Sequence, residues 1–433
     1  MSAQAQNVTR ITVDGDEVVR LARDLIAIES HSEALGREAP IGRFLVDWFR
    51  TRGIEADLVP AIGDRANVIA WHRHPALDEA KPGRTLLLNG HIDTVPAGAM
   101  KDAFTPRIED GVLWGRGACD MKGAIAAMAG VLAAMARGEA SLRLPDSDFD
   151  SAAAHRNQAL GELSGASVTT PGRGASLRGT LIFAGTVDEE TGSLGVKRLV
   201  ESGLKADYAV VGEPTNLGVA VAHKGACFIR ITLTGRGAHG SCPEKGVSAV
   251  SYGARIVAAL EDELRPRLAQ RTYPLLGAST VSVGHLCGGT EPNIVAERCE
   301  IDVDRRTLPG EADTVGEVQD VVAAICDGVE GLTYEVYETE RTSTVPHVAL
   351  GTAPDSPLVL AAAAACREAS LPVDPVGVTY WTDGAHLAAN GIETVILGPG
   401  DIANAHGPND HVRVNDVVKA ADIYLHIAYA LLR

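Results

Sequence analysis

The sequence predicts an α/β protein whose larger unit is a mixed, mostly parallel sheet flanked by helices. Short runs that are largely apolar on both faces, such as ANVIAWH at 66–72 and RTLLLNG at 84–90, alternate with helical stretches. Strands that are covered by helices on both sides have this pattern. Between 219 and 337 apolar and polar residues alternate instead, and 433 residues exceed the usual size of one core. We therefore expect two units, one inserted into the other.

The larger unit begins with two helices. Apolar residues recur at helical spacing in DEVVRLARDLIAI (16–28), and a second helix is expected over 40–52. The further predicted elements are strands at 66–72, 84–90, 179–185 and 206–212, helices at 122–136 and 195–202, then a helix at 356–369, a strand at 393–398 and a closing helix at 415–432. The stretch 138–178 is rich in Gly, Ser, Ala and Asp and shows no period, so no element is assigned to it.

The inserted unit is expected over 219–337, which divides the larger unit into 1–218 and 338–433. Its predicted elements are a strand at 226–235, a helix at 246–265, strands at 279–289 and 297–308, and a further helix. Strands with one polar face, covered by helices on the other face, are typical of a two-layer α+β sandwich.

Composition argues against several classes of partner. The chain has 39 Lys and Arg against 56 Asp and Glu, a net charge of −17, whereas nucleic acids and anionic membranes attract clustered cations. The start MSAQAQNVTR has no signal-peptide pattern, and the longest apolar stretch, at 124–136, is shorter than the about 20 residues of a bilayer span. Seven cysteines without a CxxC pair favour a reducing compartment. We expect a cytoplasmic protein.

Acidic residues and histidines stand where the predicted strands end. His91 and Asp93 follow the run at 84–90, and residues two apart in an extended chain point the same way, so Asp93 is placed to orient the ring of His91 for metal binding. Asp120 lies in a glycine-rich turn before a helix. The remaining members are Glu189 and Glu190 after 179–185, Glu213 after 206–212, and the late histidine His406.

Each of these residues alone has an ordinary structural explanation as a solvated loop residue, a helix cap or an Asx turn. Together they lie at the carboxyl ends of buried strands, where open α/β sheets bind ligands. A cluster of like charges needs a compensating cation. Asp120, Glu189, Glu190 and Glu213 supply four negative charges, which two divalent ions would balance. The sequence therefore predicts a site for two metal ions.

Two other kinds of chemistry are rejected. Cys119, beside Asp120, has no base in the neighbouring sequence and no feature that would lower its pKa, as a nucleophilic thiol requires. The stretch GRGACD lacks the last glycine of the dinucleotide-binding pattern GxGxxG. Residues 381–384 are a further candidate for the wall of the pocket.

Six motifs occur in the order in which a known family carries them. They are GHIDTVPAG, LWGRGACDMKGAIAAM, TVDEETGSLG, VVGEPT, GRGAHGS and GPGDIANAHGPND, and they lie between about residues 86 and 411. The series resembles the dinuclear zinc amidohydrolases, which include acetylornithine deacetylase, succinyl-diaminopimelate desuccinylase, carboxypeptidase G and the aminoacylases. The last motif is most similar to that of the acetylornithine deacetylase branch.

The resemblance implies a set of metal ligands. Asp120 would bridge both ions, His91 and Glu213 would complete one site, and Glu190 and His406 the other. Zinc is preferred because imidazole with carboxylate ligands suits it, with cobalt or manganese as substitutes. The resemblance also implies a cis peptide bond directly after the bridging acid.

The resemblance assigns further roles outside this ligand set. Glu189 would be the general base that takes a proton from the metal-activated water, and Asp93 would support the ring of His91. The inserted unit would act as a lid and as the surface of a homodimer, in which His239 reaches the site of the partner subunit and stabilises the oxyanion. Asn293 and Arg306 would bind the carboxylate of the substrate.

These implications predict a metal-dependent hydrolase that cleaves the amide bond of an N-acyl amino acid or a small dipeptide. Alternatives are a desuccinylase, a dipeptidase or carboxypeptidase, and a non-catalytic protein of the same fold that binds amino acids or peptides. Such a binding protein would lack a ligand or the base, and none is missing here. The length of the 138–178 stretch departs from the family pattern.

Overall fold

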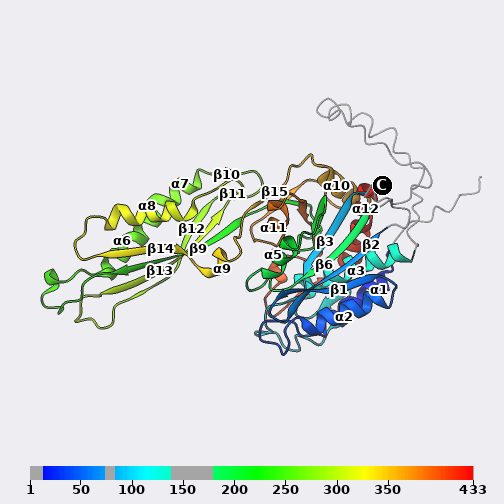
Figure 1. The fold of residues 1–433 in the computed structure, drawn as a ribbon, viewed down its shortest axis with the longest axis horizontal. Helices are drawn as coiled ribbons and strands as arrows, with labels where there is room; N and C mark the ends of the chain where they lie inside the picture. Colours follow the sequence, from blue (N-terminus) through cyan, green and yellow to red (C-terminus); the bar gives the residue numbers. More distant parts are fainter. Residues whose placement is uncertain (1–12, 74–82, 138–178, 433) are drawn as a thin grey trace, which may run out of the picture.

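The computed structural model describes residues 13–73, 83–137 and 179–432, which form two lobes (Figure 1). The larger lobe contains a nine-stranded mixed sheet between helical layers, and the smaller one contains a four-stranded sheet with helices on one face. This architecture confirms the predicted α/β class. The stretch 138–178, to which the sequence assigned no element, lies outside the described residues.

The large sheet has four parallel strands at its centre. In sheet order its members are β1 (Glu55–Ile62), β2 (Arg65–Arg73), β6 (Thr180–Thr186), β3 (Thr85–His91), β7 (Tyr208–Val211), β17 (Glu393–Ile396), β8 (Ala220–His223) and β15 (Leu350–Gly351), with β16 (Val376–Val378) beside β8. Strands β6, β3, β7 and β17 run parallel, whereas β2 pairs with β6 and β8 with β17 in the antiparallel sense. The four central strands therefore end at one edge of the sheet, and the segments that follow them meet there.

Two apolar cores lie on the two faces of this sheet. One core contains buried residues of α1 (Gly15–Ile26), α2 (Ala39–Arg50), α3 (Gly123–Ala136), α10 (Pro357–Glu368) and α12 (Val414–Leu431). The other contains residues of α5 (Leu194–Glu201) and α11 (Gly384–Ala389). Along β3, Leu86 and Leu88 belong to the first core and Leu87 to the second, which explains why the strand is apolar throughout.

Helix α3 lies at the centre of the first core. Its residues from Gly123 to Met135 are all buried, so its sequence is apolar all round instead of amphipathic. The helical run Ala118–Ala136 is longer than the apolar stretch counted from the sequence, and its length and composition would suffice to span a membrane. The whole run is nevertheless buried inside the lobe, where a core helix has the same composition.

The smaller lobe is an antiparallel sheet in the order β12 (Thr280–Gly288), β13 (Arg298–Thr307), β9 (Gly225–Thr234) and β14 (Thr333–Glu338). Helices α6 (Ala249–Ala259), α7 (Arg265–Ala269) and α8 (Thr314–Cys326) contribute to its core. Strand β14 was not among the expected elements, because none of its residues is buried and its hydrophobic signal is weak. Strand β8, placed in the inserted unit by the expected boundary at 219, pairs within the large sheet.

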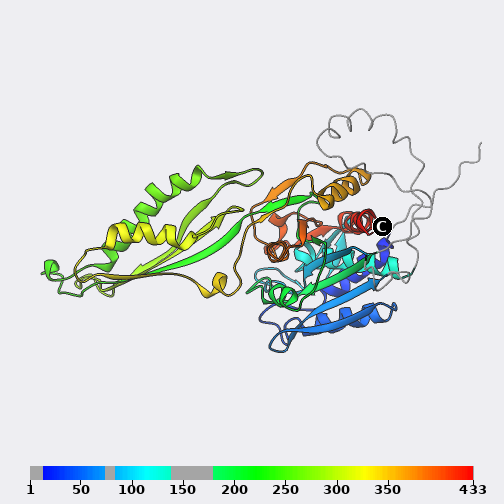
Figure 2. The same ribbon diagram turned by 45° about the horizontal axis from the view of Figure 1, so that its top comes forward.

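Two chain segments join the lobes (Figure 2). Strand β8 leads directly into β9, and the chain returns through α9 (Glu340–Ser343) to β15. On the returning segment, the ring of His347 stacks on Trp381 with 4.1 Å between centroids, and Trp381 Nε1 donates a hydrogen bond to the oxygen of Val348 at 3.1 Å. Trp381, which the sequence suggested for the wall of the pocket, thus contacts this segment through a ring stack and a hydrogen bond.

The remaining short strands are β4 (Arg107–Glu109), β5 (Val112–Trp114) and β18 (His411–Arg413), which form a three-stranded sheet, and the pair β10 (Thr272–Tyr273) and β11 (Gly277–Ala278). All seven cysteines lie among the described residues and are free thiols.

Candidate metal centre

The five side chains predicted to bind metal meet at the carboxyl edge of the central strands. His91 is the last residue of β3, and Glu190 and Glu213 follow the ends of β6 and β7. His406 lies in the loop after β17, and Asp120 lies in the turn that leads into α3. The apolar strands hold these polar residues at a common edge because the strands run parallel.

These side chains form two groups that share Asp120. In the first, His91 Nε2 lies 2.8 Å from Asp120 Oδ1 and 3.6 Å from Glu213 Oε1. In the second, His406 Nε2 lies 3.1 Å from Asp120 Oδ2 and 3.0 Å from Glu190 Oε1. Within each group the three ligand atoms are all less than 4.8 Å apart. Asp120 therefore offers one carboxylate oxygen to each group.

The turn that contains Asp120 packs against the carboxyl ends of β3 and β7. The peptide bond Asp120–Met121 is cis, as the resemblance implies. The side chain of Met121 lies over Gly90 and Gly212, and a Cβ atom at Gly212 would be 2.8 Å from Met121 Cε. The absence of a side chain at these two strand ends thus leaves the space that Met121 fills next to Asp120.

Burial and neighbouring charges shift the pKa values of the acids. Burial raises the pKa of Glu213 well above its usual value, and the charge of Asp120 raises it further. Burial also raises the pKa of Glu190. For Asp120 burial acts in the same direction, but hydrogen bonds with His406 and His91 outweigh it and lower the pKa.

The histidines are shifted toward the protonated form. Hydrogen bonds to Asp120 and Glu190 raise the pKa of His406 to about 10. Burial would lower the pKa of His91, but the charge of Glu213 and the hydrogen bond to Asp120 raise it well above its usual value. Both upward shifts are caused by carboxylates of the same cluster.

The donor set fits divalent cations. Among the described residues, no lysine or arginine forms an ion pair with Asp120, Glu190 or Glu213. Imidazole nitrogen with carboxylate oxygen is a ligand combination that zinc and neighbouring transition metals accept. His91 Nδ1 lies 3.0 Å from the backbone oxygen of Asp93, and a hydrogen bond donated there leaves Nε2 free to bind a cation.

Asp93 also organises the turn after β6. Its carboxylate lies 3.5 Å from His91 Nδ1, farther than its own backbone oxygen. The two carboxylate oxygens instead accept hydrogen bonds from the backbone N–H groups of Glu189 at 3.3 Å and Glu190 at 3.1 Å. Asp93 thus holds the His91 ring through its main chain and the two glutamates through its side chain.

Glu189 differs from its neighbour Glu190. The Glu190 carboxylate pairs with His406, whereas no described residue donates a hydrogen bond to the carboxylate of Glu189. Burial raises the pKa of Glu189 well above its usual value, and the charge of Glu213 adds to this shift against the opposing effect of His91. A carboxyl group with a raised pKa beside two ligand groups has the properties of a general base.

The structure does not bring the other three predicted residues to this cluster within one chain. His239 is exposed in a loop of the smaller lobe, where its Nδ1 contacts Ser241 Oγ at 2.8 Å. Asn293 is close to it, since the Asn293 backbone oxygen accepts a hydrogen bond from Gly240. Arg306 lies at the opposite end of β13, with its Nε 2.9 Å from Asp304 Oδ1.

Sequence reasoning missed buried ion pairs that shape the site. Asp188, the first acid of the run 188–190, has a left-handed backbone with φ of 75°. Its carboxylate accepts hydrogen bonds from Arg65 at 2.7 Å and Thr191 at 2.6 Å, and Arg65 Nε is 2.7 Å from Glu38. Asp410 and Arg116 form a second buried pair beside the Asp120 turn. Nothing in the local sequence marks these partners, because they are far apart in the chain.

The structure supports the rejection of Cys119 as a nucleophile. Burial, together with the charge of Asp120, raises the pKa of the Cys119 thiol far above its usual range. The thiol donates a hydrogen bond to the backbone oxygen of Asp401 at 3.2 Å. Cys119 is therefore a buried, protonated residue that packs beneath the turn.

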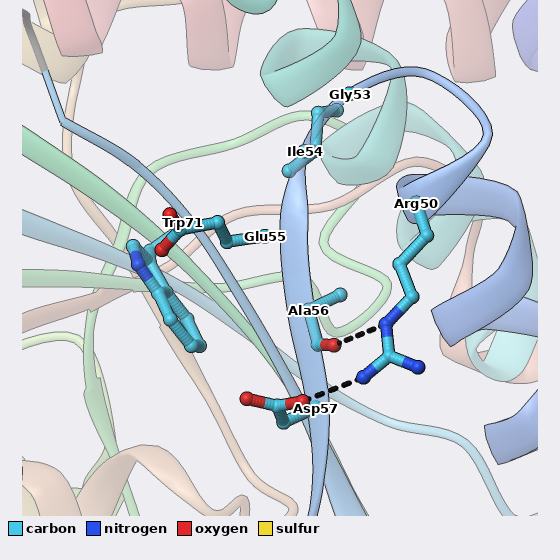
Figure 3. Close-up of a pocket in the computed structure, with 7 residues that line it drawn as sticks. All are labelled: Arg50, Gly53, Ile54, Glu55, Ala56, Asp57 and Trp71. Atoms are coloured by element: carbon cyan, nitrogen blue, oxygen red, sulfur yellow. Dashed lines mark hydrogen bonds and ion pairs between the residues drawn. The ribbon is translucent and has the colours of Figure 1, made fainter.

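Two surface hollows lie apart from the five predicted ligands. One of about 360 Å³ lies beside α2 and β1, where Arg50 donates a hydrogen bond to the oxygen of Ala56 at 2.9 Å (Figure 3). Another of about 580 Å³ lies in the smaller lobe between the loops that contain Gly240 and Glu291. The second hollow adjoins the loops of His239 and Asn293 and contains none of the five predicted ligands.

Comparison with known proteins gives consistent results. The model of peptidase family M20/M25/M40 matches residues 87–144 and 166–430. Acetylornithine deacetylase of Myxococcus xanthus is 30% identical over 341 residues, which are 77% of this chain and 77% of that protein.

Solved structures share the fold at lower identity. Aminopeptidase PepT from Bacillus cereus aligns with a TM-score of 0.73 and 21% identity, covering 97% of this chain and 100% of that one. A dinuclear metal-binding M20 peptidase from Bacillus subtilis aligns with a TM-score of 0.67 and 15% identity, covering 96% and 98%.

Proposed function

The chain belongs to peptidase family M20/M25/M40 and is a metallohydrolase, and from this membership we propose that it removes the acyl group from N-acyl amino acids. The observation that carries the proposal is the pair of ligand groups that share Asp120. The 30% identity to an acetylornithine deacetylase favours an N-acetyl amino acid as substrate over a longer peptide.

We propose Zn²⁺ at both groups, with Co²⁺ or Mn²⁺ as substitutes. His91, Asp120 and Glu213 would hold one ion, and Asp120, Glu190 and His406 the other. When bound, the two cations would polarise the amide carbonyl and lower the pKa of a water molecule.

The chain's own residues supply the proton transfers. Glu189, whose carboxylate accepts no hydrogen bond from the described residues, would take a proton from the attacking water and deliver it to the leaving nitrogen. The hydrogen bonds from the backbone of Glu189 and Glu190 to Asp93 would keep this base at a fixed position beside the ligands.

The proposal includes a homodimer. His239 is exposed and contacts none of the metal ligands of its own chain, so as an oxyanion donor it would act on the site of a second subunit. Arg306 and Asn293 would bind the free carboxylate of the substrate, and Arg306 would have to exchange its contact with Asp304 for that carboxylate.

The test is a panel of amides assayed with the zinc-loaded protein. N-acetyl-ornithine, N-succinyl-diaminopimelate and a simple dipeptide represent the deacetylase and its two nearest alternatives. We expect the highest kcat/KM for N-acetyl amino acids. A preference for the succinyl compound or the dipeptide would replace the proposed substrate class, and no hydrolysis of any amide would favour a non-catalytic binding protein.

A further inference from the structure

Asp410 connects two distant segments of the candidate metal centre. Its Oδ1 accepts a hydrogen bond from the backbone N–H of Cys119 at 2.9 Å, and its Oδ2 accepts one from Gly117 at 2.8 Å. The backbone oxygen of Asp410 accepts a third from Gly115 at 3.1 Å. One residue thus binds three N–H groups of the turn that ends at Asp120.

This turn has no side-chain cap of its own. Gly117 precedes the turn with a left-handed φ of 83°, Asp120 and Met121 have non-helical dihedral angles, and no side chain within the turn accepts a hydrogen bond from its first N–H groups. A buried backbone N–H group without a hydrogen-bond partner is costly, so the N–H groups of such a turn need acceptors from elsewhere in the chain. The carboxylate of Asp410 supplies two of these acceptors from a segment near the other end of the chain.

Arg116 extends the connection to His406. Its guanidinium is 3.1 Å from Asp410 Oδ2 and is almost completely buried. Its Nη2 also donates to the backbone oxygens of Gly407 at 3.1 Å, His406 at 3.4 Å and Ala97 at 3.1 Å. These contacts hold the loop in which His406 has a left-handed φ of 60°.

We propose that Asp410 is a positioning residue of the metal centre, which together with Arg116 fixes the carboxylate of Asp120, shared by both ligand groups, relative to the imidazole of His406. Asp410 belongs to neither ligand group, so it acts through the turn and the loop. This inference rests on the proposed function, because it requires that the two groups bind cations.

The test measures metal binding instead of turnover. Asp410→Asn keeps the size of the side chain but replaces one acceptor oxygen with a donor that faces other donors. Glu317→Gln is the matched control, since Glu317 pairs with the buried Arg305 at 2.8 Å in the smaller lobe. Both variants lose one carboxylate from a buried arginine pair, and only one of them adjoins the cluster.

Zn²⁺ affinity is measured by competition with a chelator, and the visible absorption of the Co²⁺ form reports the ligand geometry. We expect Asp410→Asn to lose about 10- to 100-fold in affinity for at least one ion and to change the Co²⁺ spectrum, whereas Glu317→Gln keeps both. Wild-type affinity and spectrum in Asp410→Asn would overturn the proposal, and so would an equal loss in the control.

A second variant covers the case in which Asp410→Asn does not fold. Arg116→Lys keeps a cation beside Asp410 but cannot reach all the backbone oxygens that arginine contacts. The same loss in affinity and the same spectral change are expected for it, and wild-type behaviour would contradict the positioning role. If the wild-type protein itself binds no cation, the proposed function fails. If it binds two and these variants do so equally well, the positioning role alone fails.

Discussion

The carboxylate of Asp93 accepts a hydrogen bond from the backbone N–H of Glu190 at 3.1 Å, so a residue that follows β3 fixes the chain that follows β6. The same carboxylate accepts a hydrogen bond from Glu189. Because side chains of neighbouring residues diverge, this anchoring directs Glu190 to His406 and leaves the carboxylate of Glu189 without a donor among the described residues. Two adjacent acids thereby acquire different environments.

Asp93→Asn should lower kcat/KM about 10- to 100-fold, as loss of a residue that orients metal ligands typically does. The amide nitrogen would face the N–H groups of Glu189 and Glu190 or the ring of His91, and one of these contacts would become repulsive. Steady-state kinetics with metal analysis of the same samples measures the effect. Wild-type kcat/KM with two ions bound would show that the anchoring is dispensable.

Glu189→Gln and Glu190→Gln should separate the base from the ligand. Loss of a general base typically costs about 10²- to 10⁴-fold in rate, so Glu189→Gln should lower kcat by that amount and still bind two ions. Glu190→Gln should lose metal affinity as well, because its carboxylate belongs to the second ligand group. Equal metal loss in both variants, or wild-type kcat in Glu189→Gln, would refute this division of roles.

The histidines around Trp381 should make the protein sensitive to acid. Burial lowers the pKa of His347 to about 4, and the charge of His386 adds to this shift; burial likewise lowers that of His223 to about 4. The unfolded chain, with a histidine pKa near 6.5, therefore binds more protons than the folded one between about pH 4 and 6.5. The contribution of these histidines to the free energy of unfolding is complete above about pH 6.5 and is lost as the pH falls toward 4.

His347→Phe keeps a ring that can stack on Trp381 but removes the titrating nitrogen. Relative to this variant, the wild type should lose on the order of 1–3 kcal/mol in free energy of unfolding between pH 7 and 4.5. Urea denaturation at both pH values gives the difference. Parallel pH dependence of the two proteins would mean that His347 does not titrate in this way.

Mixed dimers test the proposed role of His239. His239→Ala and Glu189→Ala should each be nearly inactive alone. When the two variants are unfolded and refolded together, random pairing gives one subunit of each variant in half of the dimers. One of the two sites in each mixed dimer would have both His239 and Glu189. About a quarter of wild-type activity should therefore return. Activity no higher than the sum of the separate variants would indicate that His239 does not reach a partner's site.

The placement of the metal cluster could be predicted because it depends on local patterns. Runs such as 84–90 and 179–185 are apolar on both faces, which identifies them as central strands, and the polar residues directly after them must then lie at one edge. The shared position of Asp120 and the cis bond after it were expected only from the resemblance to a family. The structure brings all five side chains together.

The supporting contacts could not be predicted in the same way. Arg116 and Asp410 are 294 residues apart, and Arg65 and Asp188 are 123 apart, so no local spacing links them. Their significance depends on burial, which the sequence does not specify for a charged residue. Asp93 was expected to orient the His91 ring with its carboxylate, but the nearer acceptor is its backbone oxygen, a contact that only the three-dimensional path of the chain determines.

The metal content of the purified protein tests the central claim most directly. Elemental analysis after equilibration with Zn²⁺ should give two ions per chain for the wild type, and fewer than two for Asp120→Ala, because that variant removes the residue shared by both groups. Exhaustive chelation should abolish amide hydrolysis, and added Zn²⁺ should restore it. Full activity in protein that retains no metal ion would contradict the account.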